Sequence, residues 1–164
     1  MKRLLICRHA KSAWDNPLLS DQRRPLAARG LRDAPKMAKR LKKKGIFPDH
    51  ILSSNAVRAF ETAKIMAKEI GYETSRIETS RELYLASANA ILKQIRVMPD
   101  HINTLFIFGH NPGFNDLIET LGGDIFNLPT SGQFGFRFAV NSWASIGREN
   151  AEEWFFDYPK NKED

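Results

Sequence analysis

Short apolar runs that end abruptly in charged residues recur along the chain. The first covers residues 4–7 and stops at Arg8 and His9, and a second covers residues 104–108 and leads to His110. Each run consists of β-favouring residues and is too short for an ordinary helix, so each predicts a buried strand. In open α/β sheets, ligands bind beyond the carboxyl ends of the strands. The polar residues at these ends are therefore candidates for a functional site.

Segments with a helical period separate these strands. Apolar residues that recur three and four positions apart predict the helices, and a glycine follows each of the first two. The predicted helices cover residues 31–44, 55–70 and 87–97, and a fourth starts at 111–112. In the fourth, we expect Asn111 as the N-cap and Pro112 at the first helical position.

The remaining strands complete an α/β pattern. A weaker strand is predicted at 50–54, and two segments at 133–140 and 153–158 predict a hairpin at the sheet edge. Alternating strands and helices predict a three-layer α/β/α sandwich with a mostly parallel central sheet. A chain of 164 residues suits one domain, which we expect over residues 1–158, and we expect residues 159–164 to fray.

The charge of the chain is strongly basic, with a formal net charge of +6 and a pI of about 9.6. The densest basic run, residues 36–44, accompanies an apolar stripe from Leu31 to Leu41, which predicts a solvated helix face with its charges turned outwards. Pro35 is expected near the first turn of this helix. Because aromatic residues do not alternate with the basic ones, a nucleic-acid partner is not expected.

Cysteine content and hydropathy bear on the compartment. The chain has a single cysteine, Cys7, so no intramolecular disulfide can form. No segment approaches the roughly 18 uninterrupted apolar residues of a membrane span. We therefore expect a cytoplasmic protein without a membrane partner.

Parallel strands would bring two arginines and two histidines to one edge of the sheet. Arg8 and His9 follow the first strand, His110 follows the strand at 104–108, and Arg58 lies in the first turn of the second helix. Arg58 falls off the apolar stripe of that helix and close to its amino terminus, where backbone N–H groups also favour an anion. This set predicts an anion-binding site.

Three sequence blocks carry a family resemblance. They are Arg8-His9-Ala10, then Ser53-Ser54 with Arg58-Ala59 and Thr62-Ala63, then Gly109-His110-Asn111-Pro112-Gly113. In this order they resemble the histidine phosphatase superfamily in its Arg-His-Gly/Ala form, which implies a phosphoglycerate-mutase-like fold. Together with the short chain, Arg8 to Ser12, Arg24-Pro25-Leu26 and Arg29-Gly30 look most like the SixA-type phosphohistidine phosphatases.

The resemblance implies roles for the gathered residues. His9 would be the nucleophile that accepts the phosphoryl group, Arg8 and Arg58 would hold the phosphoryl oxygens with permanently charged forks, and His110 would supply a further donor. His9 must be neutral to attack, and nearby positive groups favour that form. Glu82 is the expected proton donor. Neither a metal nor a cofactor is required by this arrangement.

Other residues are expected near the substrate or are left open. We expect substrate contacts from Ser12, Asn16, Gly109, Asn111 and Gln133. The acids Asp15, Asp21 and Glu61 compete with Glu82 as proton donors. Asp15 stands where mutase-like members commonly have an asparagine, which puts a phosphate contact at that position in doubt. Cys7 is expected in the core, because the Cys-x₅-Arg spacing of cysteine phosphatases is absent.

The expected function is a metal-independent phosphatase that works through a phosphohistidine intermediate on the enzyme. Because a chain of 164 residues leaves little for a lid over the site, we expect phosphohistidine in a protein, such as a signalling protein, as the substrate. One alternative is a phosphatase or mutase that acts on a small phosphorylated metabolite. Another is a domain that binds phosphorylated ligands without catalysis.

Overall fold

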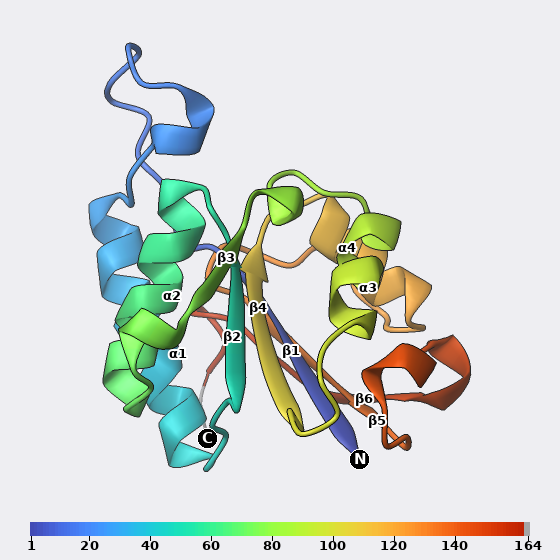
Figure 1. The fold of residues 1–164 in the computed structure, drawn as a ribbon. Coiled ribbons are helices and arrows are strands. Elements are labelled where there is room, and N and C mark those ends of the chain that lie inside the picture. The colour runs from blue at the N-terminus through green and yellow to red at the C-terminus, as the bar shows by residue number, and fades with distance from the viewer. Residues whose placement is uncertain (163–164) are drawn as a thin grey trace.

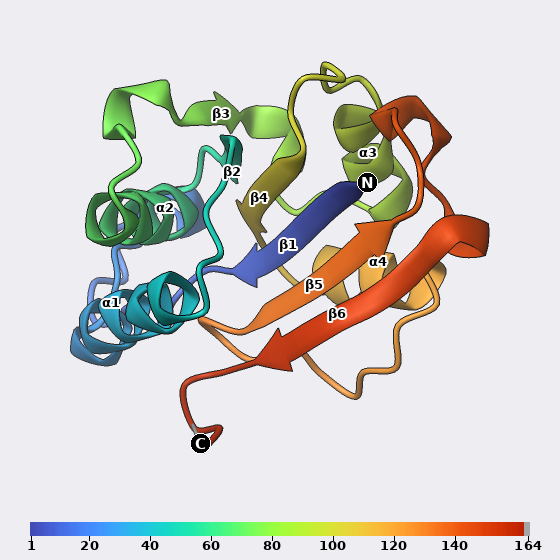
Figure 2. The ribbon, with the colours of Figure 1, turned by 90° about the horizontal axis from the view of Figure 1, so that it is seen from below.

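The computed structural model describes residues 1–162, and at its centre lies a six-stranded sheet with the order β3-β2-β4-β1-β5-β6. Helices α1 and α2 cover one face of the sheet and α3 and α4 cover the other (Figure 1), an arrangement also visible from below (Figure 2). This architecture confirms the predicted three-layer α/β/α sandwich. The strands are β1 (Lys2–Arg8), β2 (His50–Ser54), β3 (Glu78–Ser80), β4 (Thr104–Gly109), β5 (Gln133–Phe138) and β6 (Ala151–Asp157). The helices are α1 (Ala28–Lys43), α2 (Val57–Ile70), α3 (Ala88–Arg96) and α4 (Gly113–Thr120).

The sheet is mostly parallel, as predicted. β1 pairs parallel with β4, β4 with β2, and β2 with β3. By contrast, β5 pairs antiparallel with β1, and β6 pairs antiparallel with β5. The predicted hairpin is therefore present at the sheet edge, with β6 outermost. Across residues 1–162, no helix combines the length and apolar character needed to cross a bilayer.

Strand β1 is buried on both faces because it lies inside the sheet. Leu4 and Ile6 pack into the apolar layer beneath α3 and α4, and Leu5 and Cys7 pack into the layer beneath α1 and α2. All four side chains are at most 1 % exposed. Alternation along the strand accounts for this division. Polar residues can emerge only where the strand ends, which is the position of Arg8.

Helix α1 begins earlier than the sequence suggests, and this corrects two predictions. It starts at Ala28, so Pro35 lies inside the helix and beyond its first turn, and Leu31 is 54 % exposed instead of buried. Gly30 lies in the new first turn, where an added Cβ would come within 2.3 Å of the Lys11 carbonyl oxygen. Glycine disfavours helix on propensity alone, but here it permits the close approach of α1 to the segment after β1.

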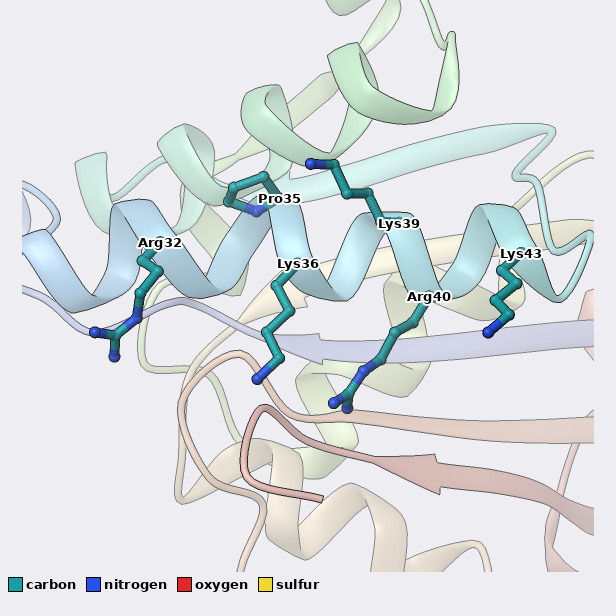
Figure 3. Close-up of a pocket in the computed structure, with 6 residues that line it drawn as sticks. All are labelled: Arg32, Pro35, Lys36, Lys39, Arg40 and Lys43. Atoms are coloured by element: carbon teal, nitrogen blue, oxygen red, sulfur yellow. The ribbon is translucent and has the colours of Figure 1, made fainter. Parts of the chain in front are cut away.

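The basic run on α1 forms a stripe along the helix. Figure 3 shows Arg32, Lys36, Lys39, Arg40 and Lys43 following one another along it. The four lysine and arginine neighbours of Arg40 in this view, Arg32, Lys36, Lys39 and Lys43, all lie at exposed positions, as the solvated-face prediction requires. Arg40 departs from that prediction because it is only 6 % exposed.

Arg40 fastens the C-terminal segment to α1. Its guanidinium donates to Asp157 Oδ1 at 3.0 Å and to the Asn161 carbonyl oxygen at 2.9 Å. The expectation that residues 159–164 fray is thus corrected for the segment up to Asn161, because a buried charge requires these partners. Residues 163–164 lie outside the described part of the chain.

The start of α4 also differs in detail from its prediction. The Asn111–Pro112 peptide bond is cis, and the helix begins at Gly113, so Pro112 precedes the helix instead of opening it. Pro112 therefore takes the N-cap position predicted for Asn111, although Asn111 Oδ1 still accepts from the Asn115 N–H of the first turn at 3.1 Å. Gly113 lies so close to the Ala86 carbonyl oxygen that an added Cβ would be 2.0 Å from it. This close contact leaves no room for a side chain at position 113.

Candidate active site

The ends of β1 and β4 bring two histidines together. The strands are neighbours in register, with Arg8 opposite Gly109, and the His9 N–H donates to the Gly109 carbonyl oxygen at 3.1 Å. The His9 and His110 rings follow directly, with their centroids 5.3 Å apart. The sequence prediction that parallel strands deliver both histidines to one place agrees with this geometry.

His9 is a buried and neutral imidazole with one defined tautomer. Its side chain is 7 % exposed, and Nδ1 lies 2.8 Å from the Ala10 carbonyl oxygen. Because that oxygen can only accept, Nδ1 carries the proton and Nε2 keeps its lone pair. Burial first, and then the charges of Arg58 and Arg8, lower the pKa of His9 from 6.5 to about 4. Near pH 7, Nε2 is therefore available as a nucleophile.

His110 is held by a serine from the neighbouring strand. Its Nε2 lies at hydrogen-bond distance, 2.8 Å, from Ser54 Oγ, and that oxygen accepts from the Ala56 N–H at 3.2 Å. Burial first, and then the charges of His9 and Arg58, lower the pKa of His110 to about 3. His110 is thus neutral in this structure, and an anion beside it would favour its protonated form.

Two arginines flank the histidine pair. Arg8 donates from Nη1 to the Leu128 carbonyl oxygen at 2.9 Å, and burial followed by the charge of Arg58 lowers the pKa of Arg8. Arg58 is the second residue of α2 and only 3 % exposed, so the expectation that it lies off the buried face is corrected. A loop segment at Asp21 covers it, which the helical period alone does not reveal.

Three buried nitrogen atoms on these residues, two of them guanidinium N–H donors, have no hydrogen-bond partner. They are Arg8 Nε, Arg58 Nε and His110 Nδ1. An unpaired buried donor costs about 1–3 kcal/mol, more when it is charged. Their gathering on three residues that meet beside His9 fits a group with several acceptor oxygens and negative charge, such as a phosphoryl group.

Asp21 is the acid that the structure places at Arg58. It lies in a short 3₁₀ turn, η1 (Asp21–Arg23), within the long loop between β1 and α1. Arg58 donates from Nη1 to the Asp21 carbonyl oxygen at 2.7 Å and from Nη2 to Asp21 Oδ2 at 3.0 Å. The Tyr84 hydroxyl donates to the same Oδ2, and Arg24 Nε donates to Oδ1 at 3.2 Å. The hydrogen bond from Tyr84, together with Arg58 and Arg24, lowers the pKa of Asp21 to about 2.

The sequence identified Asp21 only as one of several acids that compete for the role of proton donor. Its contacts reach Arg58 and Tyr84, which lie 37 and 63 positions away along the chain. The Tyr84 ring in turn meets the His110 ring edge-on, with centroids 5.5 Å apart. A local signal was present, since Asp21 precedes the Arg24-Pro25-Leu26 block, but no periodic pattern marks a loop residue.

Three other expected site residues have local partners. Glu82 is exposed, and no hydrogen bond or ion pair within residues 1–162 joins it to His9 or His110, so its role as proton donor stays a prediction. Ser12 is 5 % exposed, and its Oγ accepts from Arg24 Nη1 at 2.9 Å. Asn16 Oδ1 accepts from the Leu18 N–H at 3.1 Å.

The remaining expected contacts have structural surroundings of their own. An added Cβ at Gly109 would lie 2.7 Å from the Phe114 ring, so the site wall requires a glycine there. Asn111 Nδ2 donates at 2.9 Å to the Leu128 carbonyl oxygen that also accepts from Arg8. Gln133 is 1 % exposed, and both of its amide atoms lack a partner. Direct contact of these residues with substrate stays a prediction.

The surroundings also bear on other phosphatase chemistries. Burial raises the pKa of the Cys7 thiol well above its usual range, so Cys7 is a core residue and not an activated nucleophile. Within residues 1–162, no three His, Cys, Asp or Glu side chains gather in a way that could hold a metal ion.

Comparisons with known proteins agree with this geometry. The model of the histidine phosphatase superfamily (branch 1) matches residues 4–96. The chain is 34 % identical over 153 residues to an uncharacterised chloroplastic protein of Arabidopsis thaliana, covering 87 % of this chain and 69 % of that protein. It is 33 % identical over 150 residues to an uncharacterised protein of Mycobacterium tuberculosis, covering 85 % of this chain and 90 % of that protein.

Solved structures resemble the whole chain. A protein assigned as the phosphohistidine phosphatase SixA of Agrobacterium tumefaciens superposes with a TM-score of 0.81 at 25 % identity, covering 96 % of this chain and 98 % of that one. The fold also matches a protein histidine phosphatase SixA in complex with tungstate, with a TM-score of 0.80 at 20 % identity, covering 96 % and 97 %. The fold is that of the phosphoglycerate-mutase-like proteins. From the matched family and the site at the ends of β1 and β4, we conclude that this chain belongs to branch 1 of the histidine phosphatase superfamily and is a phosphatase.

Proposed function

We propose that the protein is a metal-independent phosphatase that removes the phosphoryl group from phosphohistidine in a protein, with His9 as the nucleophile. The observation that carries this proposal is the state of His9. Its Nδ1–H is held by the Ala10 carbonyl oxygen, and burial keeps the ring neutral, with a pKa of about 4. A lone pair on Nε2 is thus fixed beside Arg8, Arg58 and His110.

The reaction has two steps. The Nε2 lone pair attacks phosphorus in line while the bond to the leaving group breaks, which produces a phosphohistidine at His9. Water then attacks the same phosphorus, and the electron pair of the broken P–N bond returns to Nε2. Arg8 and Arg58 stabilise the equatorial oxygens in both steps, and His110 supplies a further donor. Each such preorganised donor typically contributes about 10²–10³ in rate.

The predicted substrate class rests on two supports. The similar SixA structures are named as histidine phosphatases, and their fold covers nearly this whole chain. Elements from β1 to β6 account for most of the described residues, and the loop around η1 is the segment that projects beyond the strand ends (Figure 1). A protein surface carrying a phosphorylated histidine can approach a site of this kind. The free, buried thiol of Cys7 suits the reducing cytoplasm, where we place the reaction.

The test compares two substrates in the presence of a metal chelator. A phosphotransfer protein phosphorylated on histidine is offered beside p-nitrophenyl phosphate, with His9→Ala and His101→Ala as variants. His101 is exposed and outside the site, so its variant is the matched control. We expect turnover of the phosphoprotein, a loss on the order of 10⁴-fold or more in His9→Ala, and no loss in His101→Ala.

Other outcomes would revise the proposal in defined ways. His9-dependent turnover of the small ester alone keeps the nucleophile and rejects the protein substrate, in favour of a phosphatase or mutase for small metabolites. Phosphate binding without any turnover in the wild type rejects catalysis altogether. Glu82→Gln belongs in the same series, because the predicted proton donor should matter more for the ester than for phosphohistidine.

A further inference from the structure

The Arg58–Asp21 ion pair at the site has the opposite polarity to a protonated phosphohistidine. Arg58 offers a cation for the phosphoryl group, and directly beside it Asp21 offers an anion, with Nη2 and Oδ2 3.0 Å apart. A phosphohistidine whose second ring nitrogen is protonated carries an anionic phosphoryl group next to a cationic imidazole. We propose that Asp21 is a specificity-determining residue that accepts the ring N–H of the substrate imidazole and so selects P–N over P–O substrates, an inference that rests on the proposed function.

The position of Asp21 suits a contact with the leaving group. Its side chain is 43 % exposed, whereas that of Arg58 beneath it is 4 % exposed, so the carboxylate lies on the solvent side of the arginine. In-line attack by His9 from the end of β1 places the leaving group on the opposite side of phosphorus, towards the site entrance. The proposed contact places the leaving imidazole beside Asp21 on this solvent side.

The hydrogen bonds around Asp21 show how it can take this contact. Oδ2 accepts from Arg58 and from the Tyr84 hydroxyl, and Oδ1 accepts from Arg24 Nε at 3.2 Å, with Arg24 Nη2 at the same distance in an ion pair. The three hydrogen bonds occupy most of the about four acceptor positions of a carboxylate. A phosphoryl group that engages Arg58 withdraws one donor from Oδ2. The freed position then accepts the imidazole N–H, and each charge of the former ion pair obtains a new partner.

The charged and titratable groups that face Asp21 all favour its ionised form or leave it unchanged. They are Arg24 on its own segment, Arg58 on α2, Tyr84 after the turn at Arg81–Leu83, and His110 at the end of β4. An ionised carboxylate cannot donate the proton that an alkoxide leaving group needs. When the phosphoryl group binds Arg58, a neutral alcohol provides no new cationic partner for Asp21. Phosphate esters are therefore disfavoured for two reasons: Asp21 cannot protonate their leaving group, and their leaving group cannot pair with Asp21.

With phosphohistidine, the transfer balances without an added acid. The Nε2 lone pair of His9 forms the new bond to phosphorus, and the electron pair of the breaking P–N bond goes to the substrate ring nitrogen. The proton on the other ring nitrogen stays in place, so a neutral imidazole leaves. The imidazole of the substrate and that of His9 then have the same arrangement. Asp21 accepts the ring N–H of the substrate, just as the Ala10 carbonyl oxygen accepts the Nδ1–H of His9.

The test removes the charge of Asp21 with the isosteric Asp21→Asn variant. Steady-state rates are measured between pH 6 and 9 on phosphoimidazole, a P–N substrate, and on p-nitrophenyl phosphate, a P–O substrate. Glu152→Gln is the matched control, because Glu152 is also an exposed carboxylate paired with an arginine, but its partner is Arg137 on β5 instead of a site residue. The phosphorylated phosphotransfer protein is assayed in parallel.

We expect Asp21→Asn to lower kcat for phosphoimidazole at least tenfold at pH 8. The alkaline limb of its kcat profile should move to lower pH, because the bound imidazole loses the carboxylate that keeps it protonated. For p-nitrophenyl phosphate, kcat/KM should stay within about threefold or rise. Glu152→Gln should behave like the wild type on both substrates.

Equal losses on both substrates would overturn the proposal, since they would show that Asp21 only positions Arg58. An unchanged rate on phosphoimidazole would overturn it as well. If the P–N preference depends on Asp21 but the phosphoprotein is not hydrolysed, the role of Asp21 stands and the protein substrate is wrong. If the wild type hydrolyses p-nitrophenyl phosphate and not phosphoimidazole, both proposals are wrong.

Discussion

The charge state of His9 offers the most direct quantitative test of the site. Burial lowers its pKa from 6.5 to about 4. One pKa unit corresponds to about 1.4 kcal/mol, so the folded site disfavours the protonated ring by about 3 kcal/mol. At pH 5, a histidine with a pKa of 4 is about 90 % neutral, whereas one with a pKa of 6.5 is about 3 % neutral. The nucleophilic form is thus about thirty times more abundant at that pH than for an exposed histidine.

The assay is an NMR titration of the Cε1–H signals of the four histidines between pH 3 and 8. Comparison with His9→Gln identifies the His9 signal, and far-UV circular dichroism defines the pH range in which the chain stays folded. We expect the His9 signal to remain that of neutral imidazole down to pH 5. A His9 signal that titrates near 6.5 in the folded protein would refute this reasoning.

A variant separates the two causes of the low pKa. Burial is the largest cause, and the charge of Arg58 is a smaller one. In Arg58→Gln, the pKa of His9 should therefore rise but stay well below 6.5. A return to the ordinary value would show that charge, and not burial, dominates. Phosphate should raise the pKa of His110 in the wild type, because an adjacent anion favours the imidazolium.

The same shift makes the protein sensitive to acid. Between pH 6.5 and about 4, the unfolded chain binds more protons at His9 than the folded chain does. The free energy of unfolding therefore falls as the pH falls through this window, and His110, with a pKa of about 3, extends the loss further into acid. Urea unfolding at pH 7 and pH 5 should show less acid sensitivity in His9→Gln than in the wild type.

Two further predictions concern stability, both measured by urea unfolding. Gly113→Ala should destabilise the protein by about 2–3 kcal/mol, because the new Cβ would lie 2.0 Å from the Ala86 carbonyl oxygen. As a control, Gly71→Ala, in open space at a φ of +80°, should cost only about 1 kcal/mol. An equal cost for both variants would contradict the steric reasoning. Arg40→Ala should cost about 3 kcal/mol, because it removes the guanidinium 3.0 Å from the buried carboxylate of Asp157 and leaves that carboxylate with Lys44, at 3.7 Å, as its cation. A cost below about 1 kcal/mol for Arg40→Ala would show that the pair behaves like a surface salt bridge.

Much of the fold follows from local patterns. The run at residues 4–7 is apolar on both faces and therefore marks an interior parallel strand, and the structure places β1 between β4 and β5. Once β1 and β4 are parallel neighbours, the meeting of His9 and His110 follows from register alone. The edge hairpin could also be predicted from the sequence, because the alternation of apolar and polar residues in its two segments differs from the continuous apolar runs of the buried strands.

Errors occurred where a distant contact overrides a local preference. The helical period predicts a start at Leu31, but α1 begins at Ala28, and Gly30 in its first turn permits the close approach of the Lys11 backbone. Arg58 falls off an apolar stripe, but the loop at Asp21 covers it. Helical period reports which residues are apolar and not which polar residues a remote loop will bury.

The sequence by itself determined the elements other than the short β3, their alternation along the chain as an α/β pattern, and the identities of the residues at the strand ends, because each depends on neighbours only a few positions away. The tertiary structure alone decided the chemistry of those residues. His9 is neutral because the surrounding chain excludes water from it, and Asp21 is ionised because Arg58 and Tyr84, 37 and 63 positions away, donate to it. Desolvation and hydrogen bonding act through space, so no pattern along the chain encodes them.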